Sequence, residues 1–246
     1  MVGLGRTVKQ VRAGPITCDP WGCRSEREDE LIRRLRAYPP VPFYPPGYRQ
    51  RGWRAETVSV LALWQLAEAQ RGLKQKKMLN PVAEKYMLAN ALVEGRFDRG
   101  NGRLDPTDFG VNMSDDKVYE RLGRVTGDPA LGSSWSARSS LESARTFAET
   151  SQEARLPGLI YALTFEHKTG GYADAVYKGG ASESQRVSLW NGRGKTYLKG
   201  QDGKRTKFAD ADNHARKVEG MRAVLNHEYN RELVTCWEKL LEGRLP

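Results

Sequence analysis

The sequence predicts an α+β protein in which an N-terminal helical part and a C-terminal helix pack around a mostly antiparallel central sheet. Apolar residues recur at helical spacing over residues 55–96 and again over 212–241. Between them, over 117–210, the pattern changes to short runs rich in β-branched and aromatic residues. We therefore predict a basic, Pro-rich arm over 1–54, followed by a single domain over 55–246.

The arm contains one predicted helix and one extended stretch. Over Glu26–Ala37, Leu31, Ile32 and Leu35 share one face, which indicates a short amphipathic helix. The prolines of Pro39–Gly47 fix φ and remove backbone donors, so this stretch is expected to be extended. We interpret it as a linker or a strap laid over the domain, with a ligand for a partner's aromatic groove as the alternative.

The helical part is predicted to contain two helices, joined to the rest by a long loop. The first covers about 55–71 and is apolar on more than one face, which indicates burial. The second begins at Asn80-Pro81, a capping residue followed by proline at the first helical position, and ends near 94. The Gly- and Asp-rich stretch 97–116 has the composition of a loop.

The central region is predicted to be rich in β-strands, with one helix inside it. A hairpin is expected with its turn at Asp202-Gly203. The expected strands are 118–125, 159–166, 172–178, 186–190 and the hairpin pair 195–198 and 205–208, and the expected helix is 139–150.

The net charge of +10 and the pI of about 9.6 favour a polyanionic partner, although a basic composition without such a partner accounts for them equally well. The predicted hairpin concentrates basic side chains, and Tyr197 and Phe208 in it could stack on bases. The candidate nucleic-acid contacts are Lys195, Lys199, Lys204, Arg205 and Lys207.

The three cysteines and the short apolar runs argue against a zinc site and against a membrane span. Cys18 and Cys23 have no nearby His or Cys to complete a zinc site, so we expect two reduced cysteines in a loop and no metal. The longest apolar run, Val58–Trp64, is far shorter than a membrane span. No targeting signal is readable, so the predicted location is the cytoplasm.

One motif carries a resemblance to a known family. Ser134-Trp135-Ser136 precedes a predicted helix of the form A-x-x-F-A, formed by Ala144, Phe147 and Ala148, and a predicted strand follows. This arrangement resembles the middle of the arginine-type ADP-ribosyltransferase fold, over about residues 117–200. The same residues also fit an ordinary strand end and helix cap, and that alternative stays open.

The resemblance implies NAD as a substrate, with ADP-ribose transferred to a macromolecular acceptor or NAD hydrolysed. It implies that Arg121 or Arg124 binds the NAD phosphates or ribose, and that Ser134 or Ser136 orients the catalytic groups. It assigns Trp135 to the nicotinamide pocket and Glu183 to the developing oxocarbenium charge. The family pattern has a second acidic position two residues later, where this chain has Gln185.

Two other functions compete with the enzyme. One is a non-catalytic, basic nucleic-acid-binding protein that uses the arm and the hairpin. The other is an assembly protein that docks through the Pro-rich stretch and the terminal helix. An enzyme requires Arg, Ser and Glu to converge in a cleft, and a nucleic-acid binder requires one continuous basic face.

Overall fold

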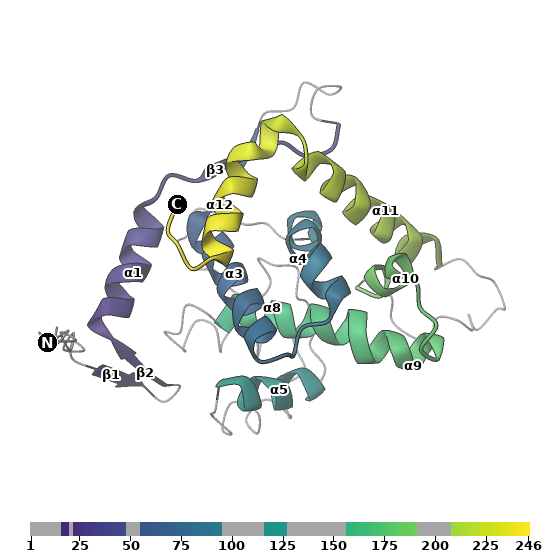
Figure 1. Cartoon of the computed structure of the whole chain (residues 1–246), viewed down its shortest axis with the longest axis horizontal. Helices are drawn as coiled ribbons and strands as arrows, with labels where there is room; N and C mark the ends of the chain where they lie inside the picture. Colours follow the sequence, from purple (N-terminus) through teal and green to yellow (C-terminus); the bar gives the residue numbers. More distant parts are fainter. Residues whose placement is uncertain (1–15, 20–21, 48–54, 95–115, 127–155, 191–207) are drawn as a thin grey trace, which may run out of the picture.

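The computed structural model describes most of the chain, and Figure 1 shows the arrangement of its helices and strands. Three long helices make up its centre: α3 (Val60–Gln75), α4 (Pro81–Glu94) and α8 (Leu156–His167). The described residues are 16–19, 22–47, 55–94, 116–126, 156–190 and 208–246.

The central helices form because their sequences are apolar on nearly every side. Leu156–Phe165 is buried except at Leu159, and α8 packs against α3, α4 and α5 (Asp116–Thr126). Such a segment is stable only inside a protein core. The closest approach is at Gly158, where an added Cβ would lie 2.6 Å from the backbone oxygen of Gln65. Gly158 therefore lets the backbones of α8 and α3 come together.

The chain after α8 turns sharply and then builds the outer helices. A wide π-type turn, η2 (Lys168–Tyr172), leads into the short helix α9 (Ala173–Tyr177), and α10 (Glu183–Ser188) follows. The two C-terminal helices are α11 (Phe208–Leu225) and α12 (Arg231–Leu241), joined by a single 3-10 turn, η4 (Glu228–Asn230). Figure 1 shows α11 and α12 meeting at an angle, with α4 below them.

The N-terminal elements flank the helical centre. Strand β1 (Ile16–Asp19) pairs antiparallel with β2 (Gly22–Ser25), and α1 (Glu26–Ala37) follows at once. Strand β3 (Val41–Phe43) pairs antiparallel with β4 (Glu56–Val58). The α+β class, with helices packed around a small antiparallel sheet, is confirmed.

Several predictions about the N-terminal and helical parts are confirmed. The predicted helix over Glu26–Ala37 forms with those bounds, and α4 begins at Pro81, where the Asn80 side chain accepts a hydrogen bond of 2.8 Å from the Ala83 amide. The extended Pro-rich stretch forms β3, whose Val41 and Phe43 are buried against the domain as a strap. It packs against α12 of the same chain.

The strands predicted between 117 and 210 are wrong wherever the structure describes this region. Residues 118–125 lie in α5, residues 159–166 in α8, residues 172–178 in η2 and α9, and residues 186–190 in α10 and its C-terminal end. The predicted hairpin over 195–207 and the predicted helix over 139–150 lie outside the described residues.

Three smaller predictions also need correction. The first helix, predicted over about 55–71, begins at Val60 and ends at Gln75, because residues 56–58 pair with β3 as the strand β4. Cys18 and Cys23, expected in a loop, are directly opposite each other in the β1–β2 register. The single helix predicted over 212–241 is interrupted after Leu225, where Asn230 is buried. The Asn230 amide donates to the carbonyls of Val224 and Tyr44, so the interruption ties α11 to the N-terminal strap.

None of the helices in the described part of the chain is long and apolar enough to cross a membrane.

Candidate functional site

A buried polar network joins α4, α8 and α11. The His214 ring lies between two oxygen atoms: Nδ1 is 3.0 Å from Oε1 of Glu94, and Nε2 is 2.8 Å from Oδ1 of Asn90. The Asn90 amide donates to the Tyr161 hydroxyl at 2.9 Å, and that hydroxyl donates to the Met87 carbonyl at 3.1 Å. Both ring nitrogens of His214 therefore have an oxygen partner on α4.

This network is almost closed to solvent. Asn90 and Tyr161 are fully buried, and the side chain of His214 is 1% exposed. Burial raises the pKa of Tyr161, a hydrogen bond from Asn90 opposes that shift, and the Glu94 carboxylate adds to it. Since Glu94 is the last residue of α4 and its side chain is 22% exposed, it is the member of the network nearest to water.

Lys168 lies beside this network, at the start of η2. Its amine donates a hydrogen bond of 2.7 Å to the Trp190 carbonyl and lies 4.8 Å from the centre of the Trp190 ring. The Trp190 ring in turn packs against Tyr161 and Phe165, at centroid distances of 5.2 and 5.7 Å. Burial lowers the pKa of Lys168 to about 8, and the charge of Glu94 opposes that shift.

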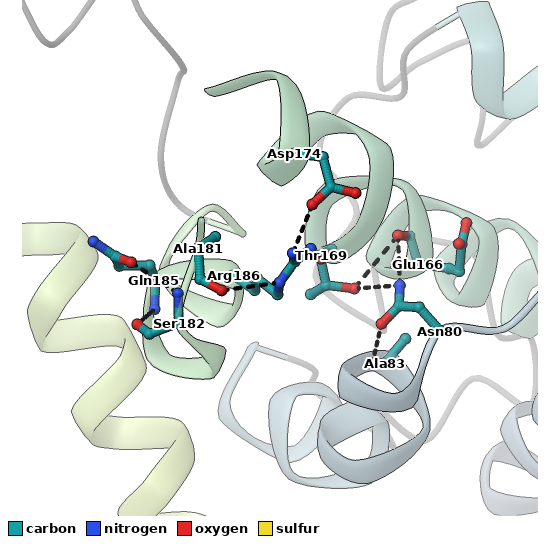
Figure 2. Close-up of polar contacts among 9 residues, drawn as sticks. All are labelled: Asn80, Ala83, Glu166, Thr169, Asp174, Ala181, Ser182, Gln185 and Arg186. Atoms are coloured by element: carbon teal, nitrogen blue, oxygen red, sulfur yellow. Dashed lines mark hydrogen bonds and ion pairs between the residues drawn. The ribbon is translucent and has the colours of Figure 1, made fainter. Parts of the chain in front are cut away.

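Two side chains from elsewhere in the chain, Asn80 before α4 and Arg186 of α10, bind the backbone of the turn after α8 (Figure 2). Its backbone leaves the helical region at Gly170, with φ −100° and ψ −112°. The Asn80 amide donates to the Glu166 carbonyl and to the Thr169 hydroxyl, each at 3.1 Å. Arg186 donates to the Thr169 carbonyl at 2.8 Å. The carbonyls that the break releases from the helix therefore have new donors, as π-type turns require.

Arg186 also fixes the position of α10 relative to η2 and α9. Its guanidinium pairs with Asp174 at 2.6 Å and donates to the Ala181 carbonyl at 3.3 Å (Figure 2). Helix α10 itself begins with a capping box, in which the Ser182 hydroxyl accepts from the Gln185 amide and the Gln185 side chain accepts from the Ser182 amide. Gln185 therefore caps a helix, at the position where the resemblance expects a second acidic residue.

Glu183, the predicted catalytic carboxylate, belongs to a polar cluster on the surface between α4, α10 and α11. It pairs with Lys85, and its carboxylate lies 3.0 Å from the Tyr86 hydroxyl, whose proton it shares with the Glu219 carboxylate. The guanidinium of Arg222 lies 5.0 Å from the centre of the Tyr86 ring. Hydrogen bonds from Lys85 and then Tyr86 lower the pKa of Glu183.

The two arginines predicted to bind NAD do not contact the partners of Glu183. Arg121 pairs with Glu166 and donates to the Met78 carbonyl at 3.3 Å, so it braces α5 against α8. Arg124 is exposed on α5. Arg121 and Glu183 thus belong to two different polar clusters. The remaining candidates lie outside the described residues: Ser134, Trp135, Ser136, Lys195, Lys199, Lys204, Arg205 and Lys207.

Sequence reasoning missed Asn90 and Lys168 and treated His214 as an ordinary surface or core histidine. A signal for Asn90 was present, because it is the only amide in the otherwise apolar run Tyr86–Val93. No sequence signal marks Lys168 as buried, since a lysine at a helix end is normally solvated. His214 is indeed a core residue, and its partners come from a helix more than a hundred positions earlier.

Among the described residues, no group of three or more His, Cys, Asp or Glu side chains gathers in a way that could hold a metal ion. Comparisons of the chain with protein-family models, with curated proteins and with solved structures find no match.

Proposed function

We propose that this protein binds nucleic acid through the basic segment 191–207, which the helical part holds at both ends. The observation that supports the proposal is the distribution of charge. The residues that the structure describes include 22 Lys and Arg and 21 Asp and Glu, so they are almost neutral. The segment 191–207 alone has six basic residues and one acidic residue.

This distribution favours a polyanionic partner over a generally basic composition. If the excess charge served only solubility, we would expect it to be spread over the helical surface as well. Instead, the other excess lies in residues 1–15 and 48–54, which have three basic residues each and no acidic residue. Concentrated basic segments are typical of chains that neutralise phosphates.

The anchoring of the segment also supports the proposal. On its N-terminal side, Trp190 is 4% exposed and its carbonyl accepts the Lys168 hydrogen bond. On its C-terminal side, α11 packs against α10 and is fixed by the buried His214. The helices on both sides of the segment are therefore packed on one core.

The test compares two triple variants with the same change in charge. In the first, Lys204, Arg205 and Lys207 are replaced by Ala. In the matched control, Lys76, Lys77 and Arg124, which are exposed on the helical part, are replaced by Ala. Binding of a labelled single-stranded oligonucleotide and of a duplex is measured by fluorescence anisotropy over a range of salt concentrations.

We expect the first variant to bind more weakly and its slope of log K against log salt to fall by about 2 to 3, because three phosphate contacts are lost. The control variant should keep nearly the slope of the unmodified protein. Equal slopes for the two variants, or the absence of binding at low salt, would exclude the proposal.

The ADP-ribosyltransferase interpretation stays a prediction and is the competing function. The strand that it implies over 159–166 is the helix α8, and Gln185 is used as a helix cap. Incubation with labelled NAD separates the two functions. Release of nicotinamide that is lost in Glu183→Gln would favour the enzyme, whereas salt-dependent binding without any NAD turnover would favour the nucleic-acid binder.

A further inference from the structure

A pocket lies where α1, α3 and the residues after α12 meet, and it has a volume of about 190 Å³. Figure 1 shows the chain after α12 running between that helix and α1. Helix α1 contributes Leu31 to the lining, and α3 contributes Trp64, Glu68 and Arg71. The three residues of α3 are four and three positions apart, so they lie on one face of the helix. The pocket therefore combines apolar and charged side chains from three separate parts of the sequence.

The wall after α12 is formed by the cap at the C-terminal end of that helix. Gly243 has a φ of +76°, and its amide donates to the Leu240 carbonyl at 3.0 Å, while the Arg244 amide donates to the Lys239 carbonyl at 2.8 Å. This pair of bonds is the Schellman motif, which favours glycine at the left-handed position. A Cβ added to Gly243 would collide with Nη1 of Arg71, so the glycine also leaves room for that guanidinium in the pocket.

The charged residues of the lining are two arginines and one glutamate, which gives the pocket a net positive charge. Arg71 pairs with Glu68 through Nη2, and among the described residues neither its Nη1 nor its Nε has a hydrogen-bond partner. Arg244 pairs with Glu242, which is not part of the lining. A guanidinium presents its donors in a planar fork that matches a carboxylate. Arg71 therefore has donors left for an anionic ligand.

The floor of the pocket is apolar and its rim is exposed. Trp64 is 5% exposed and Leu240 is 1% exposed, whereas the side chain of Arg244 is 66% exposed. A cavity of about 150 Å³ holds a molecule of the size of benzene. The volume of this pocket therefore matches a six-membered ring or a short alkyl chain that carries one small charged group, with the apolar part against Trp64.

We propose that this pocket binds a small monocarboxylate with an apolar body, whose carboxylate is held by Arg71 and Arg244 and whose body contacts Trp64 and Leu240. The net positive charge of the lining favours an anion over a neutral compound of the same shape. None of the lining residues belongs to the basic segment 191–207, so this site is separate from the proposed nucleic-acid contact.

A purely structural role for the charged residues makes a different prediction. Glu68 and Arg71 are three positions apart on α3, and ion pairs at this spacing stabilise a helix without any ligand. In that case a substitution of Arg71 would change the stability of the protein, and a carboxylate would bind no better than a neutral compound of the same shape. Ligand binding and its dependence on charge therefore distinguish the two roles.

The test is a titration of the full, ¹⁵N-labelled chain with benzoate, followed by NMR. Benzamide, which has nearly the same shape without the charge, and acetate, which has the charge without the ring, are the matched probes. The chain has six tryptophans, and the indole signal of Trp64 is identified by its loss in Trp64→Phe. A shift of that signal locates the bound compound in the pocket, and its concentration dependence gives the dissociation constant.

Three variants are titrated in the same way. Arg71→Gln removes the guanidinium inside the pocket, and Arg244→Gln removes the one at the rim. Arg231→Gln is the matched control, because Arg231 is exposed at the start of α12 and is not part of the lining. The side chain of Arg244 is largely exposed, so Arg244→Gln keeps the proposal testable even if Arg71→Gln does not fold.

We expect benzoate to bind saturably, with a dissociation constant of about 1 mM or below, and benzamide and acetate to bind at least about tenfold more weakly. Arg71→Gln should weaken benzoate binding at least about tenfold and Arg244→Gln about threefold, whereas Arg231→Gln should change it less than about twofold.

Three results would each overturn the proposal: no shift of the Trp64 signal, equal binding of benzamide and benzoate, or equal affinities for benzoate in the pocket variants and Arg231→Gln. The triple variant of Lys204, Arg205 and Lys207 should bind benzoate as the unmodified protein does. Failure of nucleic-acid binding would therefore leave this inference standing, and the reverse also holds.

Discussion

Asn90 is a buried amide in an otherwise apolar run of α4, and its side chain bonds to the buried His214 of α11. Each of the two partners of the Asn90 side chain is buried, so neither can turn to water if the amide is removed. A buried polar atom that loses its partner costs more than the hydrogen bond contributed. The network is therefore expected to be sensitive to single substitutions.

Replacing Asn90 by Ala should lower the free energy of unfolding by about 2–4 kcal/mol, because it leaves the Tyr161 hydroxyl and the His214 ring without their amide partner. The measurement is equilibrium unfolding in urea. The control is Asn226→Ala, at an exposed position, which should lower the free energy of unfolding by less than about 0.5 kcal/mol. Similar losses at the two positions would show that the network contributes little.

Glu183 gives a prediction about pH. Its pKa in the folded protein is lowered, mainly by the hydrogen bond from Lys85, so the ionised form stabilises the fold. That contribution is complete above the pKa of the unfolded chain and is lost as the pH falls through the lower, folded value. Thermal unfolding of the unmodified protein and of Glu183→Gln should therefore differ near pH 7 and converge in acid, and a difference that widened in acid would contradict this assignment.

The helices of the central region show which sequence signals can be trusted. In α5, Val118, Tyr119, Leu122 and Val125 recur at helical spacing, which a search for β-branched residues overlooked. In α8 nearly every position is buried, so no periodicity exists, and its aromatic and β-branched residues suggested a strand. Helices with one solvated face, such as α1, or with a recognisable capping residue, such as Asn80 before α4, were predicted correctly from the sequence.

The candidate site was harder to predict than the fold, for a physical reason. The partners of His214 come from α4, and those of Arg186 come from η2, α9 and the residue before the cap of α10. These contacts depend on how helices pack, which no local pattern records. Glu183 was predicted as a catalytic carboxylate, and the partners that the structure gives it, Lys85 and Tyr86, belong to no sequence motif.

The contact between α3 and α8 depends on the missing side chain of Gly158. An alanine there would place a Cβ 2.6 Å from the Gln65 carbonyl oxygen, which belongs to the backbone of α3. We expect Gly158→Ala to lower the free energy of unfolding by about 1–3 kcal/mol through overpacking. Gly72 in α3 has open space around it, so Gly72→Ala should stabilise the protein by up to about 1 kcal/mol. Urea unfolding of both variants checks the pair, and a stabilised Gly158→Ala would refute the close approach.

Cys236 offers a probe of the molecule as a whole. It is 5% exposed in α12, which packs against α3 and the N-terminal strap, and burial raises the pKa of its thiol to about 11. In a variant with Cys18 and Cys23 replaced by Ser, a thiol reagent near pH 8 should therefore react only when α12 opens. Its rate should rise with urea along the same transition as helical circular dichroism, whereas rapid labelling without urea would mean that α12 detaches on its own.

The break at Gly170 sets the helical phase of everything that follows it. Because each residue of an α-helix advances the chain by about 100°, one residue added to or removed from η2 would rotate α9 by that angle. Asp174 would then leave the side on which it meets Arg186, and α10 would lose its tie to the turn. A deletion of Gly170 or Gly171 that restored a regular helix would therefore be expected to misalign α9 and α10.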